Sequence, residues 1–273
     1  MMAIPSGSTA VMARRVEPPD SLDFFPTPPW ATRALCEHVL LRGPRDRFDL
    51  AGTWNYGRHI GGPMHLTHHG LPIDGLSVWE PACGEGHMAA VLAEYFGHVH
   101  ASDVFPYGFG TVADFLAPAQ LFDPPAAVAP VRWIITNPPF VRAVEFLDRI
   151  IEHYRDDVVT DGWALLLRLS WIESEDRWRV FRDFPPTLIC PFVERVPIHK
   201  GRWDPEGSTA SAYAWFVWAP RLVGGLAPPK VVHIPPGCRK ALTKPDDAAR
   251  FAPAPEAPLF ALDGAAVDGP GGG

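Results

Sequence analysis

Short runs of apolar residues alternate along the middle of the chain with segments whose apolar residues recur at helical spacing. The apolar runs, which predict strands, cover residues 76–80, 99–103, 131–136 and 163–169. The helical patterns cover residues 86–96, 141–154 and 174–183. Such alternation predicts an α/β fold with a mostly parallel, doubly wound sheet.

Two further apolar runs follow, at residues 188–193 and 212–218, with the polar loop 198–211 between them. We expect them to close the sheet, with one closing strand antiparallel to the others. The second run alternates, so Tyr213 and Trp215 share one face of the strand. Most of its aromatic side chains are therefore expected in the core.

The rest of the chain has weaker patterns. Residues 29–41 predict a helix opened by prolines. Residues 1–20 lack periodicity and are expected to be disordered, and residues 43–75 form an irregular insertion, a possible substrate loop. Pro, Ala and Gly dominate residues 224–273, which predicts a mostly disordered tail. The folded domain would then span residues 21–223.

The strand expected to end at Thr136 is followed directly by Asn137-Pro138-Pro139-Phe140. In open α/β sheets, ligands bind beyond the carboxyl ends of the strands. Proline has no N–H group and a fixed φ, so the amide oxygen of Asn137 and a neighbouring carbonyl form two rigid acceptors for one NH2 group. Phe140 offers a ring on which a planar group can stack. The tetrapeptide alone is also compatible with an ordinary turn.

A second strand, ending at Glu80, leads into the turn Pro81-Ala82-Cys83-Gly84-Glu85-Gly86, whose glycines let a ligand approach the backbone. The next strand ends at Asp103, where a carboxylate can accept from ribose hydroxyls or cap the following turn. These features indicate a nucleoside-containing cofactor. No G-x-G-x-x-G or G-x-x-x-x-G-K-[ST] motif occurs, so S-adenosylmethionine fits better than a dinucleotide or a nucleoside triphosphate.

Four segments in this order resemble the motifs of class I S-adenosylmethionine-dependent N6-adenine DNA methyltransferases, of the kind that bacteriophages and prophages carry. They are Asp23–Trp30, Glu80–Gly86, Asn137–Phe140 and Ser208–Trp218. The resemblance covers roughly residues 21 to 220. It implies a Rossmann-like fold, and the motif order is that of the γ class.

The resemblance also implies roles for individual residues. Catalysis would fall to Asn137, Pro138, Pro139 and Phe140. Cofactor contacts would come from Phe24, Phe25, Thr27, Glu80, Ala82, Gly84, Gly86 and Asp103, with Asp114 and Phe115 meeting the adenine ring. A second aromatic contact to the target base would come from Trp203 or Tyr213. Asp114 could instead be a helix cap or a surface acid.

The formal charge of −7 argues against tight nonspecific binding of duplex nucleic acid. Local basic clusters can still contact phosphates within a Debye length. One candidate cluster contains Arg195, Lys200 and Arg202. The other contains Arg177, Arg179 and Arg182, which alternate with acids and are also expected of a solvated helix face.

No run of about eighteen apolar residues and no secretory signal occurs, so we expect a cytoplasmic protein without a membrane span. The four cysteines form no C-x-x-C pair, and reduced thiols are expected. No metal is expected either. The histidines 59, 65, 68 and 69 lack the Cys or carboxylate that would complete a familiar zinc spacing.

The length leaves no room for a separate target-recognition domain, so sequence choice would depend on loops 43–75 and 198–211. RNA is the second candidate substrate, because splayed bases need no duplex opening. A protein glutamine amide is planar and weakly nucleophilic too, although such enzymes resemble Asn-Pro-Pro-Tyr rather than Asn-Pro-Pro-Phe. A noncatalytic cofactor-binding module is the fourth alternative.

Overall fold

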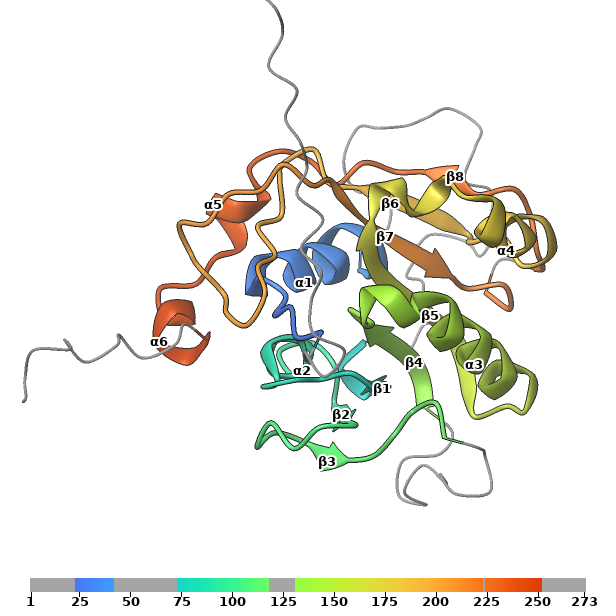
Figure 1. Cartoon of the computed structure of the whole chain (residues 1–273), viewed down its shortest axis with the longest axis horizontal. Helices are drawn as coiled ribbons and strands as arrows, with labels where there is room; N and C mark the ends of the chain where they lie inside the picture. The colour runs from blue at the N-terminus through green and yellow to red at the C-terminus, as the bar shows by residue number, and fades with distance from the viewer. Residues whose placement is uncertain (1–22, 42–72, 118–130, 223, 252–273) are drawn as a thin grey trace, which may run out of the picture.

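An eight-stranded mixed sheet forms the centre of the computed structural model (Figure 1). The structure describes residues 23–41, 73–117, 131–222 and 224–251. In spatial order the strands are β3, β2, β1, β4, β5, β7, β6 and β8. Their bounds are β1 Ser77–Glu80, β2 His98–Asp103, β3 Thr111–Val112, β4 Val131–Thr136, β5 Val159–Arg168, β6 Leu188–Pro191, β7 Tyr213–Trp218 and β8 Lys230–Val231.

Strands β3, β2, β1, β4 and β5 are parallel, and β7 runs antiparallel to both β5 and β6. The predicted fold class, a mostly parallel doubly wound sheet with an antiparallel closing strand, is confirmed. Strand order reverses between β1 and β4, because the chain leaves β1 towards β2 and returns on the other side of β1 with β4. Ligand sites are expected at such a switch point, beyond the carboxyl ends of the strands.

Helices cover both faces of the sheet. On one face, α1 and η1 pack with α2, and on the other α3 packs with α4. The bounds are α1 Pro29–Leu35, η1 Cys36–Leu40, α2 His87–Leu92, α3 Ala143–Arg155, α4 Trp178–Asp183, α5 Cys238–Leu242 and α6 Asp247–Phe251. Short 3₁₀ turns are η3 Ile73–Gly75, η5 Phe140–Arg142, η6 Leu169–Ile172 and η7 Glu175–Arg177.

The strand β7 shows how side-chain alternation builds the two cores. Tyr213, Trp215 and Val217 pack on the α1 face, whereas Phe216 and Trp218 pack on the α3 face. The buried indole of Trp215 donates to the Ala31 carbonyl at 3.1 Å, so its polar atom is satisfied. The predicted alternation is therefore confirmed, and β7 is aromatic core on both sides.

The prediction of a mostly disordered segment from residue 224 is wrong for residues 224–251. This segment adds β8 to the sheet edge and continues through α5 and α6, which lie beyond α1 (Figure 1). Ile234 and Cys238 join the α1 core, and Phe251 packs with Val91 and Trp203. The elements are only two to five residues long, too short for a periodic pattern to reveal them. Residues 1–20, 43–72 and 252–273 lie outside the described ranges.

A buried arginine holds this C-terminal segment against α1. Arg33 is 1% exposed and Asp247 is fully buried, and the guanidinium donates to both Asp247 carboxylate oxygens at 2.6 and 2.7 Å. A second pair of bonds reaches Glu94 at 2.8 and 2.9 Å. Lys244 and Arg250 also contact Glu94, at 2.9 and 3.1 Å. The cluster ties α1, the end of α2 and α6 into one ion-pair network.

We expect Asp247→Ala to lower the free energy of unfolding by about 3 kcal/mol, because removing one partner leaves a buried charge undercompensated. Chemical denaturation checks this. Asp246→Ala is the matched control, since Asp246 is 61% exposed and 3.8 Å from Arg250; it should cost no more than about 0.5 kcal/mol. Equal effects of the two substitutions would contradict the role assigned to Asp247.

Glu94 makes part of the stability depend on pH. Burial disfavours its charged form, but hydrogen bonds from Arg33, Lys244 and Arg250 prevail and lower its pKa from 4.5 to about 2. Since the folded pKa is the lower one, this stabilisation is complete above pH 4.5 and is lost as the pH falls towards 2. The difference in unfolding free energy between wild type and Glu94→Gln should shrink across that range. A difference that stays constant with pH would contradict this linkage.

Candidate active site at the carboxyl edge of the sheet

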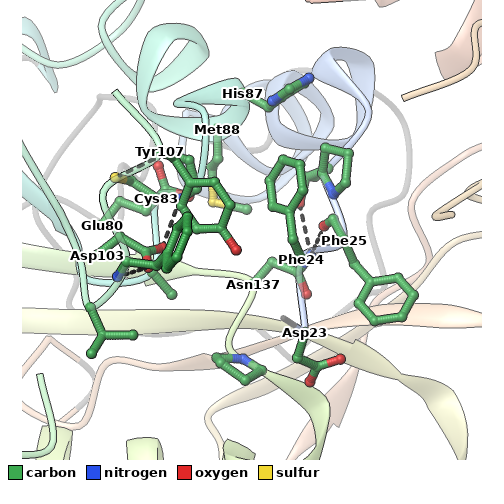
Figure 2. A pocket seen from close by; sticks show the side chains of 17 residues that line it. Asp23, Phe24, Phe25, Glu80, Cys83, His87, Met88, Asp103, Tyr107 and Asn137 are labelled. Carbon is green, nitrogen blue, oxygen red and sulfur yellow. Dashed lines mark hydrogen bonds between the residues drawn. The ribbon is translucent and has the colours of Figure 1, made fainter. Parts of the chain in front are cut away.

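A cavity of about 110 Å³ opens where β1, β2 and β4 end, at the switch point of the sheet (Figure 2). Most residues that the sequence predicts for the cofactor site line it. They are Phe24, Phe25, Thr27, Glu80, Ala82, Gly84 and Asp103, together with Asn137 and Pro139 of the catalytic tetrapeptide. The structure thus brings three distant sequence motifs to one place.

The glycine turn after β1 depends on two left-handed residues, Gly84 at φ 52° and Gly86 at φ 84°. Asp103 at the end of β2 braces this turn. One of its carboxylate oxygens accepts from the Gly84 N–H at 2.8 Å, and the other accepts from the Phe105 N–H at 3.0 Å. Asp103 therefore caps the backbone, one alternative from the sequence, and lines the cavity as well.

Aromatic rings lie directly on both glycines. A Cβ on Gly84 would stand 2.5 Å from the Phe24 ring, and one on Gly86 would stand 2.5 Å from the Phe109 ring. Phe24 also packs against Tyr107, with ring centroids 4.9 Å apart. The bare backbone of the turn is thus covered by side chains that a ligand would have to displace.

Glu80 is the most unusual titratable group of the cavity. It is 2% exposed, and among the described residues its Oε2 atom has no hydrogen-bond partner. Burial raises the pKa of Glu80 well above its ordinary value, and the nearby Asp103 carboxylate raises it further. An unpaired acceptor buried beside a second carboxylate favours a ligand that is cationic or rich in donors.

The N-terminal motif clamps the catalytic tetrapeptide. The amide nitrogen of Asn137 donates to the Phe25 carbonyl at 2.8 Å and to the Thr27 hydroxyl at 3.1 Å. A carbonyl only accepts, so this contact fixes the amide orientation and leaves Oδ1 as the free end. That oxygen is buried and has no partner among the described residues. Asn137 is thereby held with one acceptor unused.

A second hydrogen bond joins the N-terminal motif to the tetrapeptide, and the sequence did not predict it. The Phe140 N–H donates to the Asp23 carboxylate at 2.8 Å, and Asp23 also lines the cavity. Phe140 packs against Phe25 at 5.0 Å between ring centroids and against Tyr213 at 6.1 Å. The Arg168 guanidinium lies 5.1 Å from the centroid of the Phe140 ring. Pro138 and Phe140 stand next to the cavity without lining it.

Two residues that were predicted to contact the cofactor lie away from the cavity. Asp114 is exposed, and its carboxylate accepts from the Leu116 N–H at 2.9 Å, the cap that the sequence left open as an alternative. Phe115 is 1% exposed and packs against Trp79 and Phe146 in the α3 core. Neither residue lines the cavity. The Asp114 carboxylate caps its own turn, and the Phe115 ring is buried in the apolar core.

The predicted second aromatic contact to a base is also corrected for Trp203. Its side chain is 3% exposed and packs with Val91 and Phe251, on the α2 and α6 side. Tyr213 lies beside Phe140, as a contact near the target would require, but it is 3% exposed. Neither residue lines the cavity in this structure.

The two basic clusters differ. Arg177 donates to the Trp171 carbonyl, Arg179 pairs with Asp148, and Arg182 pairs with Asp183. Arg179 and Arg182 are exposed and paired with acids, as the solvated-face alternative expects, whereas Arg177 is half-buried and donates to backbone carbonyls.

The second cluster consists of Arg195, Lys200 and Arg202, all of which are exposed. Its loop reaches the cofactor motif, because the Gly201 N–H donates to the Phe24 carbonyl at 2.8 Å. The second cluster therefore lies on a loop that contacts the cavity wall.

His87 lines the cavity and was not singled out from the sequence. Its Nε2 donates to the Phe251 carbonyl at 2.9 Å, which joins the C-terminal segment to the start of α2. Burial lowers the pKa of His87 below its ordinary value. Tyr107 and Phe105 also line the cavity. Only the aromatic composition of residues 105–109 could have indicated them.

Within the described ranges, no three His, Cys, Asp or Glu side chains come together as a metal site, and no helix is long and apolar enough to span a bilayer. The histidines 59, 65, 68 and 69 lie outside these ranges. All four cysteines are buried, and none forms a disulfide within the described ranges.

No protein-family model and no curated protein matches the chain. Among solved structures it is similar to the methyltransferase subunit of a type I restriction-modification system from Streptococcus thermophilus, at 10% identity and a TM-score of 0.40, over 54% of this chain and 40% of that one. A modification subunit assigned to a type I restriction enzyme of Vibrio vulnificus YJ016 has 12% identity and a TM-score of 0.45, over 83% and 51%. A dimethyladenosine transferase from Plasmodium falciparum has 10% identity and a TM-score of 0.36, over 54% and 56%.

The chain spans about half or less of the two restriction-modification subunits. At these identities and TM-scores, the similarities do not identify a reaction. The chemistry must therefore be argued from the geometry of the cavity.

We expect Gly84→Ala to lower the free energy of unfolding by about 1 to 3 kcal/mol, because alanine is strained at positive φ. The added Cβ would also push the Phe24 ring. Gly75→Ala is the control, since a Cβ there meets nothing within 4 Å. Equal stability of the two variants in chemical denaturation would contradict the close packing of Phe24 on the turn.

Proposed function

We propose that the protein transfers a methyl group from S-adenosylmethionine to the exocyclic N6 amine of adenine in DNA. The observation that carries the proposal is the unpaired Oδ1 of Asn137, in an amide whose other end is fixed by Phe25 and Thr27. An acceptor held in this way matches a planar amine. RNA adenine is the alternative acceptor, and a glutamine amide is a weaker one.

The charge of the cavity lining and the backbone of the glycine turn suit the proposed cofactor. Its two carboxylates, Glu80 and Asp103, match a ligand with a sulfonium, an ammonium group and ribose hydroxyls. Gly84, which lines the cavity, lets the ligand approach the main chain, whereas Gly86 lies outside the lining under the Phe109 ring. The free space of about 110 Å³ is below the roughly 300 Å³ of a small-ligand pocket. Phe24 and Tyr107 would therefore move apart when the cofactor binds.

The chemical task is to make a poor nucleophile reactive. The lone pair of the adenine amine is delocalised into the ring. If one N–H donates to Asn137 Oδ1 and the other to the Pro138 carbonyl, the nitrogen is drawn towards tetrahedral geometry. Fixed acceptors also stabilise the positive charge that develops on it, an effect typically worth about 3 kcal/mol per group. No strong general base is needed, because the methylated nitrogen is acidic and loses its proton through the carbonyl to water.

The cofactor, when bound, supplies a methyl group on a sulfonium, a good electrophile without further activation. The residues of this chain would hold the reacting groups in position. The clamp between Asp23 and the Phe140 N–H fixes the ring beside the reacting amine. Phe140 is the residue that favours a base over a glutamine side chain, because its ring can stack on a heterocycle. Holding the methyl and the amine at about 3 to 3.5 Å supplies the rest of the acceleration.

The direct test incubates purified protein with methyl-labelled S-adenosylmethionine and separate pools of duplex DNA, single-stranded DNA, RNA and protein. Mass spectrometry then identifies the modified residue. N6-methyladenine in DNA supports the proposal. Label in RNA or on glutamine would overturn the substrate while keeping the mechanism. Cofactor binding without transfer to any pool would favour a binding module.

We expect Asn137→Ala to reduce methyl transfer about 100- to 1,000-fold, the usual loss when one fixed hydrogen-bonding group is removed from the transition state. Cofactor affinity, measured by calorimetry, should stay within a few fold, because the free end of the amide serves the acceptor.

Asp103→Ala is the matched comparison, because that carboxylate lies on the cofactor side. It should weaken cofactor affinity and keep more of the turnover at saturating cofactor. Equal loss of cofactor affinity and turnover in Asn137→Ala would contradict its placement on the acceptor.

A further inference from the structure

Arg168 is the last residue of β5, and its position beside Phe140 was not singled out from the sequence. Its guanidinium lies 5.1 Å from the centroid of the Phe140 ring, and its β-sheet neighbour Tyr213 packs on the same ring. The two residues are register partners, since Arg168 pairs with Tyr213 across β5 and β7. Arg168 is exposed, whereas Tyr213 is 3% exposed. An exposed cation therefore stands beside Phe140 on a strand end that is paired with the buried strand β7.

The charge of Arg168 has no acidic partner within the described ranges. Most other arginines of the described ranges are engaged, as the pairs Arg142–Glu145, Arg179–Asp148 and Arg221–Asp157 show. No carboxylate pairs with Arg168 among the described residues, and its guanidinium contacts the Phe140 ring instead. An exposed guanidinium without an acidic partner is available for an anion from outside the protein.

We propose that Arg168 binds the backbone phosphate next to the target nucleotide, which makes it a positioning residue for a nucleic-acid acceptor. The inference rests on the proposed function and makes its substrate class specific. A base that stacks on Phe140 takes the place of the guanidinium, and the backbone of that nucleotide then lies beside the released side chain. Arginine matches phosphate with two parallel hydrogen bonds. A glutamine acceptor carries no phosphate and gives Arg168 no such partner.

The exchange also accounts for the arrangement of Arg168 on Phe140. A guanidinium on an aromatic face at an exposed site is held weakly, so it yields to a stacked base. While the site is empty, the cation keeps the ring face covered. When the base arrives, the same side chain moves from the ring to the phosphate. Stacking and charge recognition are thus linked through one flexible residue on a fixed strand end.

The experiment compares wild type with Arg168→Gln, Arg168→Lys and the control Arg182→Gln, which removes the same charge from an exposed arginine paired with Asp183. The acceptor is the best-methylated oligonucleotide from the labelled pools. Kinetics give KM and kcat, and fluorescence anisotropy gives affinity over a series of salt concentrations. Cofactor calorimetry checks that each variant is folded.

We expect Arg168→Gln to raise the acceptor KM about tenfold with kcat within about twofold. The slope of log affinity against log salt should fall by about 0.7 for a single strand or about 0.9 for a duplex, the value for one lost phosphate contact. Arg168→Lys should keep most of the salt slope, because it keeps the charge. Arg182→Gln should match wild type in both.

A neutral linkage identifies the phosphate. With methylphosphonate on either side of the target adenine, wild type should lose affinity at one of the two positions. At that position the neutral linkage should not lower the affinity of Arg168→Gln any further, because this variant already lacks the phosphate contact. The role of Arg168 would be overturned if Arg168→Gln bound more weakly than wild type by the same factor on the charged and on the neutral linkage, or if its salt slope were unchanged. Either outcome would leave the methylation proposal standing. Absence of nucleic-acid methylation by wild type would overturn both.

Discussion

The hydrogen bonds of the Asn137 amide nitrogen are the constraint on which the site depends. They tie the strand end after β4 to the backbone of Phe25 and to Thr27, residues more than a hundred positions earlier. Because the amide nitrogen is used in this way, the amide oxygen is left without a partner among the described residues. The bond from the Phe140 N–H to Asp23 completes the same connection. The segment that holds Asp23, Phe25 and Thr27 is thus tied to the tetrapeptide 137–140, and under the proposed function the fold would set the distance between methyl donor and amine.

The rest of the cavity is built around that connection. Asp103 fixes the glycine turn on one side, and the loop carrying Lys200 and Arg202 reaches Phe24 on the other through the Gly201 N–H. Glu80 stays buried with an unused oxygen, which is costly unless a ligand supplies the partner. Under the proposed function, the acidic lining would suit the cationic cofactor and the exposed basic loop would suit the polyanionic acceptor. Such a separation would let a protein of net negative charge bind both ligands.

The parts of the site that lie within a few consecutive residues could be predicted from the sequence. Asn137 to Phe140 and Gly84 to Gly86 each depend on local backbone chemistry, and strand ends in a parallel sheet necessarily meet at one edge. Partner choice over long distances could not be predicted. Nothing in the sequence near Asp23 points to the Phe140 N–H.

The same reason explains two of the errors. The dipeptide Asp114-Phe115 has the same sequence whether its phenylalanine ring faces a ligand or the core. Phe115 turned to Trp79 and Phe146. Trp203 stands in a polar loop beside basic residues, yet residues 224–251 brought Phe251 to cover it. That segment was itself missed, because its short helices are held by long-range ion pairs and a few apolar anchors rather than by a repeating pattern.

The pairing of Arg33 with Asp247 joins residues 214 positions apart. During synthesis α1 leaves the ribosome long before residue 247, and its arginine remains without this partner until nearly the whole described chain has been made. Contacts between such distant residues form late and slow the final step of folding. The Phe251 carbonyl that holds His87 arrives later still. His87 lines the cavity, so part of the cavity wall depends on the far end of the described chain, and a nascent chain would acquire this part of its shape only after residue 251 has been made.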